Sequence, residues 1–98
     1  MRTERDLQAY FIKECKKKGW LARKAETPGH RGWPDLIIVK DDGSVWFVEL
    51  KSPTGAGVLS LQQTKTIARL NSLGANALVI SSVAEVDEFI QRGVTSHG

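Results

Sequence analysis

Residues 33–51 read WPDLIIVKDDGSVWFVELK, and the predicted fold is built outward from this stretch. Two runs rich in β-branched and aromatic residues lie on either side of a polar segment that contains Asp42 and Gly43. An Asp-Gly pair between two such runs is a strong signal for a β-hairpin. With Asp42 and Gly43 as the two central turn residues, Asp41 would face Ser44. The stretch therefore predicts two antiparallel strands joined by a tight turn.

The same pairing gathers three charged side chains at the open end of the hairpin. Asp35 would lie opposite Leu50, and Glu49 would lie opposite Leu36. Side chains alternate between the two faces of a strand, so Glu49 and Lys51 share a face. Two carboxylates and one ammonium group would therefore stand close together at the end of an otherwise apolar sheet.

Asp35 and Glu49 suit the hydrolysis of phosphodiesters. Hard cations such as Mg²⁺ prefer oxygen ligands, and one or two carboxylates together with a substrate phosphate can hold them. Lys51 would orient the attacking water or offset the charge that builds on the phosphorus. Either motif alone is common, because Pro-Asp often precedes a strand and Glu-x-Lys is often an exposed strand edge. Their occurrence on two strands of one hairpin favours a catalytic site.

The motifs also resemble those of a known family. Pro-Asp at residues 34–35, followed by Glu-Leu-Lys at 49–51, resembles the PD-(D/E)xK nuclease superfamily. The form GWPDL at 32–36, with SLQQ at 60–63, is more narrowly similar to the virus-type replication-repair nuclease (VRR-NUC) domain. The resemblance extends from Glu4 to about Ile80, which is nearly the whole chain.

The resemblance implies a divalent cation, Mg²⁺ or Mn²⁺, held by Asp35, by Glu49 and by the main-chain carbonyl of Leu50. It implies that Lys51 orients water or stabilises the transition state.

Two further residues enter the site through the same resemblance. Glu4, on the first helix, would join the metal site through water, and Gln63 would face the metal and help to place the lysine or the nucleophilic water. Simpler interpretations exist for both. A first-turn Glu complements a helix N-terminus, and a polar residue near a helix start is often a cap partner, here of Ser60.

The implied function is that of a metal-dependent endodeoxyribonuclease of phage or bacterial origin. It would form a homodimer and cut branched DNA, such as four-way (Holliday) junctions, in replication and repair. Candidate phosphate contacts are Lys24, Arg31 and Lys65. Three alternatives stay open: a restriction-type or RNA-directed nuclease, a non-catalytic nucleic-acid-binding module, and a replication accessory protein. A large exposed apolar patch would mark the accessory protein, and Trp20 and Trp33 are the hints of one.

Bulk properties agree with a small intracellular protein. The 98 residues are expected to form one domain, 1–98, whose modest core makes dimerisation plausible. The net charge of +3 and the isoelectric point near 9.2 fit a nucleic-acid partner. The lone Cys15 excludes an internal disulfide and a cysteine-based metal site. No apolar run reaches the roughly 18 residues of a membrane helix, so the expected location is the cytoplasm.

Around the hairpin, hydrophobic periodicity predicts five further elements. They are a helix from Thr3 to Gly19, a strand at 20–24, a helix from Leu59 or Ser60 to Gly74, a buried strand at 76–80 and a helix at 82–93. A helical connection between the strand at 45–50 and the strand at 76–80 makes these two strands parallel. The order αβββαβα predicts an α/β fold with a mixed sheet flanked by helices, the restriction-endonuclease-like core that the resemblance implies.

Overall fold

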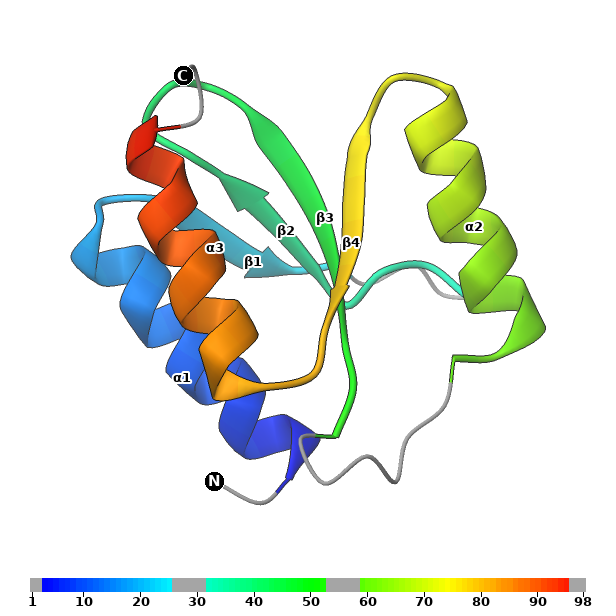
Figure 1. Cartoon of the computed structure of the whole chain (residues 1–98), viewed down its shortest axis with the longest axis horizontal. Coiled ribbons are helices and arrows are strands. Elements are labelled where there is room, and N and C mark those ends of the chain that lie inside the picture. The colour runs from blue at the N-terminus through cyan, green and yellow to red at the C-terminus, as the bar shows by residue number, and fades with distance from the viewer. Residues whose placement is uncertain (1–2, 26–31, 53–58, 96–98) are drawn as a thin grey trace.

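The predicted hairpin forms the centre of a four-stranded sheet in the computed structural model of the chain (Figure 1). The structure describes residues 3–25, 32–52 and 59–95. In chain order the elements are α1 (Glu4–Lys17), β1 (Leu21–Lys24), β2 (Leu36–Val39), β3 (Val45–Leu50), α2 (Leu61–Ser72), β4 (Asn76–Ile80) and α3 (Val83–Thr95). None of the helices in these ranges is long and apolar enough to cross a membrane.

The sheet has the strand order β1-β2-β3-β4. β1 and β2 pair in antiparallel fashion, as do β2 and β3, whereas β3 and β4 are parallel because α2 connects them. Figure 1 shows α1 and α3 together on one side of the sheet and α2 on the other side, beside β4. The predicted α/β fold, with element order αβββαβα and a mixed sheet flanked by helices, is confirmed.

The predicted register of the hairpin is wrong by one residue. Leu36 pairs with Val48 rather than with Glu49. The N–H of Lys40 donates to the carbonyl of Ser44 at 2.9 Å, so the loop has three residues instead of two. Gly43 is the last of them, at a φ of +83°. A three-residue loop that ends in a left-handed glycine is the next most favoured hairpin connection after the two-residue turns.

A side-chain hydrogen bond accounts for the longer loop. The Oδ1 atom of Asp42 accepts from the N–H of Ser44 at 2.8 Å, which stabilises Asp42 as the middle residue of a three-residue loop rather than as the first residue of a two-residue turn.

The core lies between the sheet and the helices α1 and α3. Its buried apolar residues are Leu7, Phe11, Cys15, Trp20, Ala22, Leu36, Ile38, Val48, Leu50, Ile80, Val86, Phe89 and Ile90. Phe89 packs edge-on against Phe11 and Trp46, with ring centroids 5.3 and 5.4 Å apart. Lys40 is buried beside these rings, and its ammonium group lies 4.2 Å from the centroid of Phe89. Burial lowers the pKa of Lys40.

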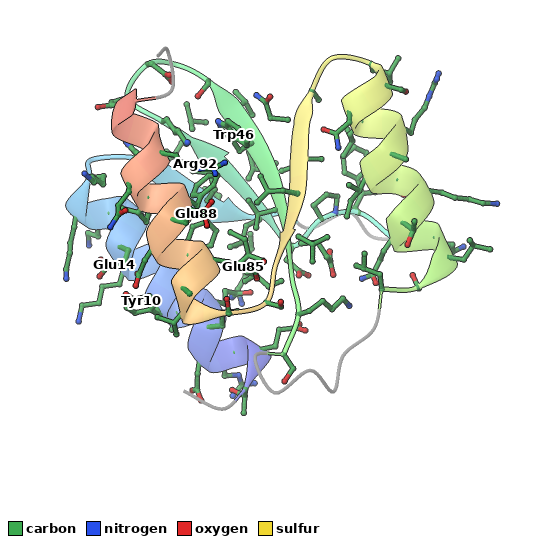
Figure 2. All side chains as sticks on the ribbon, viewed as in Figure 1. Tyr10, Glu14, Trp46, Glu85, Glu88 and Arg92 are labelled. Atoms are coloured by element: carbon green, nitrogen blue, oxygen red, sulfur yellow. The ribbon has the colours of Figure 1, made fainter. Side chains whose placement is uncertain are left out.

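A hydrogen bond also joins the two helices that cover this face. The hydroxyl of Tyr10 on α1 donates to the Oδ1 atom of Asp87 on α3 at 2.6 Å. Figure 2 shows Tyr10 beside the lower part of α3.

The opposite side, around α2, is more open than the sequence predicts. α2 has no buried residue, and β4 is half-buried except at Ile80. β4 is one of the two edge strands, so helices and strands do not surround it on all sides. The side-chain amide of Asn71 on α2 bonds both the N–H and the carbonyl of Ala77, at 2.9 and 3.0 Å, and so covers part of this edge. The prediction of a buried strand is therefore wrong in degree, because only Ile80 of β4 is buried.

Candidate active site

Asp35 lies directly before β2, and its carboxylate accepts a hydrogen bond from the main chain of β3. Its Oδ2 atom accepts from the main-chain N–H of Leu50 at 2.8 Å, and its main-chain carbonyl accepts from the N–H of Ala25 at 2.9 Å. Continuing the observed register by one pair places Asp35 opposite Glu49 rather than opposite Leu50. The corrected pairing therefore brings the two acids closer together than the sequence predicts.

Glu49 is the most deeply buried charged residue of this region, with 2% of its side chain exposed. Its Oε2 atom accepts from the Nε2 atom of Gln63 at 2.6 Å and lies 3.4 Å from the Nζ atom of Lys51. Its Oε1 atom is buried and has no hydrogen-bond partner within the described residues. A buried carboxylate oxygen without a partner is costly, and such atoms call for a ligand or another explanation.

The electrostatics of the site act against the ionised form of Glu49. Burial, and next the negative charge of Asp35, raise the pKa of Glu49 to about 7. Lys51 opposes the shift through its charge and its hydrogen bond. The site therefore favours bound positive charge at neutral pH, either a proton or a cation.

Gln63 is held in one orientation by the start of α2. The N–H of Ser60 donates to the Oε1 atom of Gln63 at 2.9 Å, and the N–H of Gln63 donates to the Oγ atom of Ser60 at 3.1 Å. This reciprocal capping box fixes which end of the amide is the acceptor. The Nε2 atom must then face Glu49, where it occupies Oε2 and leaves Oε1 open.

The register also implies that β2 donates no hydrogen bond to the carbonyl of Leu50. Continuing the register places Pro34 opposite Leu50, in the position where an antiparallel pair exchanges two hydrogen bonds. Proline has no N–H to donate. The N–H of Leu50 turns to Asp35, and its carbonyl receives nothing from Pro34. This oxygen lies on the same strand as Glu49, at the end of β3.

The donor atoms at this end of the sheet fit a hard divalent cation. They are carboxylate oxygens of Asp35 and Glu49 and the carbonyl oxygen of Leu50, the oxygen donors that Mg²⁺ and Mn²⁺ prefer. The orphaned Oε1 atom of Glu49 is the observation that favours a ligand here. Within the described ranges, no group of three or more His, Cys, Asp or Glu side chains gathers at metal-binding distance.

Glu4 is accordingly not brought together with the other two acids by its own side chain. It is the first residue of α1 and is exposed to solvent. α1 packs against β3, and Figure 1 shows the start of α1 toward the end of that strand. Contact of Glu4 with the site through water stays a prediction.

The predicted cations are distributed unevenly. Lys51 is 16% exposed and contacts Glu49 directly. Lys24 is exposed at the end of β1, one residue before the Ala25 N–H that binds the carbonyl of Asp35. Lys65 is exposed on α2, two residues after Gln63, which places it on another side of the helix. Arg31 lies outside the described residues.

Sequence reasoning missed the contributions of Pro34 and Ser60 to the site. Pro34 is visible in the motif, but its effect on the Leu50 carbonyl depends on the corrected register. Ser60 was predicted as a cap, and the structure shows that the cap also orients the amide of Gln63.

The molecule also has a cavity of about 340 Å³ on the other face of the sheet, between α3 and β4. Trp46, Glu85, Glu88 and Arg92 line it and appear in Figure 2. None of Asp35, Glu49 and Lys51 lines this cavity, so the cavity is not part of the candidate active site.

Comparison with known proteins assigns the chain to a family. The family model described as the VRR-NUC domain matches residues 3–84. A protein of Acyrthosiphon pisum secondary endosymbiont phage 1, named "Putative nuclease p44", is 33% identical over 79 residues, which are 81% of this chain and 83% of that protein.

Two solved structures share the fold. One, named "VRR_NUC domain", superposes with a TM-score of 0.83 at 31% identity and covers 93% of this chain and 97% of its own. A second, named "VRR_NUC domain protein", has a TM-score of 0.74 at 20% identity, with coverage of 95% and 88%. The second likeness shows the fold alone. The predicted family is confirmed, and this chain belongs to the VRR-NUC family of nuclease domains.

Proposed function

We propose that this protein is a metal-dependent endodeoxyribonuclease of the PD-(D/E)xK type that cuts branched DNA, such as four-way junctions. The observation that carries the proposal is the Oε1 atom of Glu49, a buried carboxylate oxygen with no partner among the described residues. The same side chain lies beside a second acid, Asp35, and its Oε2 atom lies 3.4 Å from the ammonium group of Lys51. A purely structural role would leave the cost of this arrangement without compensation.

In the proposed site, Asp35, Glu49 and the carbonyl of Leu50 hold Mg²⁺ or Mn²⁺. Such a cation polarises the phosphate and generates a nucleophile from water near neutral pH. The protein prepares the site before the cation binds, because the N–H of Leu50 fixes one oxygen of Asp35 and Gln63 fixes one oxygen of Glu49. The Oε1 atom of Glu49, which has no partner among the described residues, is then available to the cation.

Lys51 and the two supporting residues complete the proposed machinery. The Nζ atom of Lys51 is tethered to Glu49 and partly exposed, so it can reach a phosphate and offset the charge that develops on it. Gln63 positions Glu49 through a short hydrogen bond. Glu4 is proposed to contact the site through water from the start of α1.

The proposed substrate is DNA, and Lys24, Arg31 and Lys65 are proposed to contact its phosphates. Two cuts in a four-way junction need two active sites, so we propose that the chain acts as a homodimer. The phage source of the p44 relative supports action in the cytoplasm of a bacterial host.

The alternatives have less support. Trp20, one of the two hints of an accessory protein, is 6% exposed and packs edge-on against Phe89, so it offers no docking surface. A non-catalytic binding module would need phosphate-binding cations but no pair of neighbouring acids with one of them buried. The acid pair at Asp35 and Glu49 therefore favours catalysis.

The proposal is tested by cleavage of matched four-way junction, flap, linear duplex and single-stranded DNA, with a single-stranded RNA of the same sequence. Each is incubated with Mg²⁺, Mn²⁺ or EDTA and with the native protein, Asp35→Asn or Lys51→Met. Glu88→Gln, which removes an exposed carboxylate on α3, is the matched control for loss of one negative charge.

We expect junction cleavage that requires a divalent cation, that both site variants lose and that Glu88→Gln retains. Cleavage that survives in Asp35→Asn would show that the acids do not carry the reaction. Tight junction binding without cleavage under any condition would favour the binding module. Separation by size with light scattering tests the homodimer.

A further inference from the structure

The three tryptophans of the chain differ in how their indole N–H groups are used. Trp20 is buried and donates to Asp41 at 3.2 Å, and Trp46 is half-buried and donates to Ser44 at 3.0 Å. Trp33 is 37% exposed, and its N–H has no acceptor within the described part of the chain. Buried or structural tryptophans usually satisfy this donor. Trp33 is therefore the tryptophan whose ring and donor are both available to a ligand.

The ring of Trp33 is nevertheless held in place. It lies 6.1 Å from the ring of Phe47, at an interplanar angle of 54°. Its neighbour Gly32 has a φ of +88° and packs so closely on α2 that an added Cβ would lie 2.9 Å from the main-chain carbonyl carbon of Gln62. The backbone that carries Trp33 is thus fixed between α2 and the sheet.

This position is next to the candidate active site. Trp33 precedes Asp35 by two residues, and Phe47 precedes Glu49 by two residues on β3. Residues two apart on a strand share a face and lie about 6.6 Å apart. Successive nucleotides of a DNA strand rise by about 3.4 Å. The aromatic pair therefore lies within one or two nucleotides of a phosphate held by Asp35 and Glu49.

The surroundings favour a nucleic acid over an apolar protein surface as the occupant. Lys51 directly follows β3 and, by the alternation of the strand, lies on the same face as Phe47. Arg23 of β1 lies across β2 from Phe47, opposite Ile37. Cations beside an exposed aromatic ring form the combination that binds single strands, where bases stack on the ring and phosphates contact the charges. A hydrophobic partner would instead cover these charged groups with apolar surface, which costs the free energy of their desolvation.

We propose that Trp33, supported by Phe47, is a stacking platform for an unpaired nucleobase next to the phosphate that is cleaved. The inference rests on the proposed nuclease function and adds the substrate feature that the site selects. A base inside a continuous duplex has both faces covered by its neighbours, whereas a base at a branch or in a single-stranded arm can present one face to the ring. The platform would therefore favour branched DNA over linear duplex.

Binding of a splayed-arm duplex, measured by fluorescence anisotropy in EDTA, tests the platform without any cleavage. A second DNA carries abasic sites at the first two unpaired positions, so it keeps the phosphates and lacks the bases. The proteins are wild type, Trp33→Ala, Trp33→Phe and Leu73→Ala. Leu73 is 66% exposed beyond the end of α2, and its substitution is the control for loss of an exposed apolar side chain.

We expect Trp33→Ala to bind the intact DNA about 5- to 150-fold more weakly than wild type, the range for one stacked base. Trp33→Phe should retain most of the affinity, and Leu73→Ala should bind like wild type. Wild type should lose a similar factor on the abasic DNA, and Trp33→Ala should lose nothing further on it. This non-additivity assigns the loss to contact between the ring and the base rather than to misfolding.

Equal binding by Trp33→Ala and wild type, additive losses on the abasic DNA, or no binding by wild type would each overturn the platform. Cleavage of the same DNA in Mg²⁺ separates this inference from the proposed function. If wild type cleaves while Trp33→Ala binds and cleaves normally, the platform fails and the nuclease stands. If the ring binds the base but wild type never cleaves, the platform stands and the nuclease fails.

Discussion

Replacement of Glu49 by glutamine should change how the stability of the metal-free protein depends on pH. Burial and the charge of Asp35 raise the pKa of Glu49 from an ordinary 4.5 to about 7 in the folded protein. The folded state therefore binds more protons than the unfolded state between these two values, so stability falls as pH rises through this window. Below pH 4.5 the carboxyl is protonated in both states, and it contributes no cost.

The magnitude follows from the two pKa values. At 1.36 kcal/mol per pH unit, the interval from 4.5 to about 7 corresponds to a cost of about 3 kcal/mol that is complete above pH 7. Glu49→Gln is close in shape to the protonated acid and carries no charge, so it escapes this cost. Relative to wild type, the variant should gain up to about 3 kcal/mol in free energy of unfolding between pH 4.5 and pH 8.

Urea denaturation in EDTA at several pH values between 5 and 8 measures this difference. Glu88→Gln, which removes an exposed carboxylate on α3, corrects for the general effect of one negative charge. A difference between Glu49→Gln and wild type that does not change with pH would refute the reasoning. So would a variant that becomes relatively less stable as pH rises, because Glu49 would then be stabilised as an anion.

Three further predictions concern neighbouring residues. Gln63→Glu retains the capping box of α2 but presents an acceptor to Glu49. Urea denaturation should therefore show little loss of stability at acidic pH. Calorimetry should show about 10- to 100-fold weaker binding of Mg²⁺. Asp35→Asn removes the charge that repels Glu49, so the pH dependence of stability measured in EDTA should become shallower. An unchanged pH dependence would show that the charge of Asp35 does not raise the pKa of Glu49. Gly32→Ala and Gly43→Ala should each lower the free energy of unfolding by about 1–2 kcal/mol, because both glycines have a positive φ. In Gly32→Ala the added Cβ also meets a main-chain atom of Gln62, so the free energy of unfolding should fall by about 1–3 kcal/mol more. Equal losses would contradict the close approach to α2.

The sequence predicted which side chains lie together better than it predicted the register that brings them together. Alternation along β3 placed Glu49 and Lys51 on one face, and the structure shows them in contact. The register depended on the loop, where Asp42-Gly43 is compatible with both a two-residue and a three-residue turn. The hydrogen bond from the Ser44 N–H to Asp42 favours the three-residue loop, and it is a local contact that the Asp-Gly pair alone does not determine.

Long-range effects were also beyond the sequence pattern. The short contact between Gln63 and Glu49 joins residues on two different elements and needs the crossover of α2 to be in place. The raised pKa of Glu49 depends on burial, which a list of charged residues does not supply. The family resemblance implied a supporting role for Gln63, whereas the physical reason, an amide oriented by Ser60, appears only in three dimensions.

The most direct test of the central claim is a crystal structure of the protein soaked with Mn²⁺, with the cation located by its anomalous scattering. We expect an anomalous peak for a cation that is coordinated by Asp35, by the Oε1 atom of Glu49 and by the carbonyl of Leu50. Crystals of Asp35→Asn should show no peak at this position. Full occupancy by Mn²⁺ at another place, or no bound cation between these residues at saturating concentration, would contradict the claim that this end of the sheet is a metal-dependent active site.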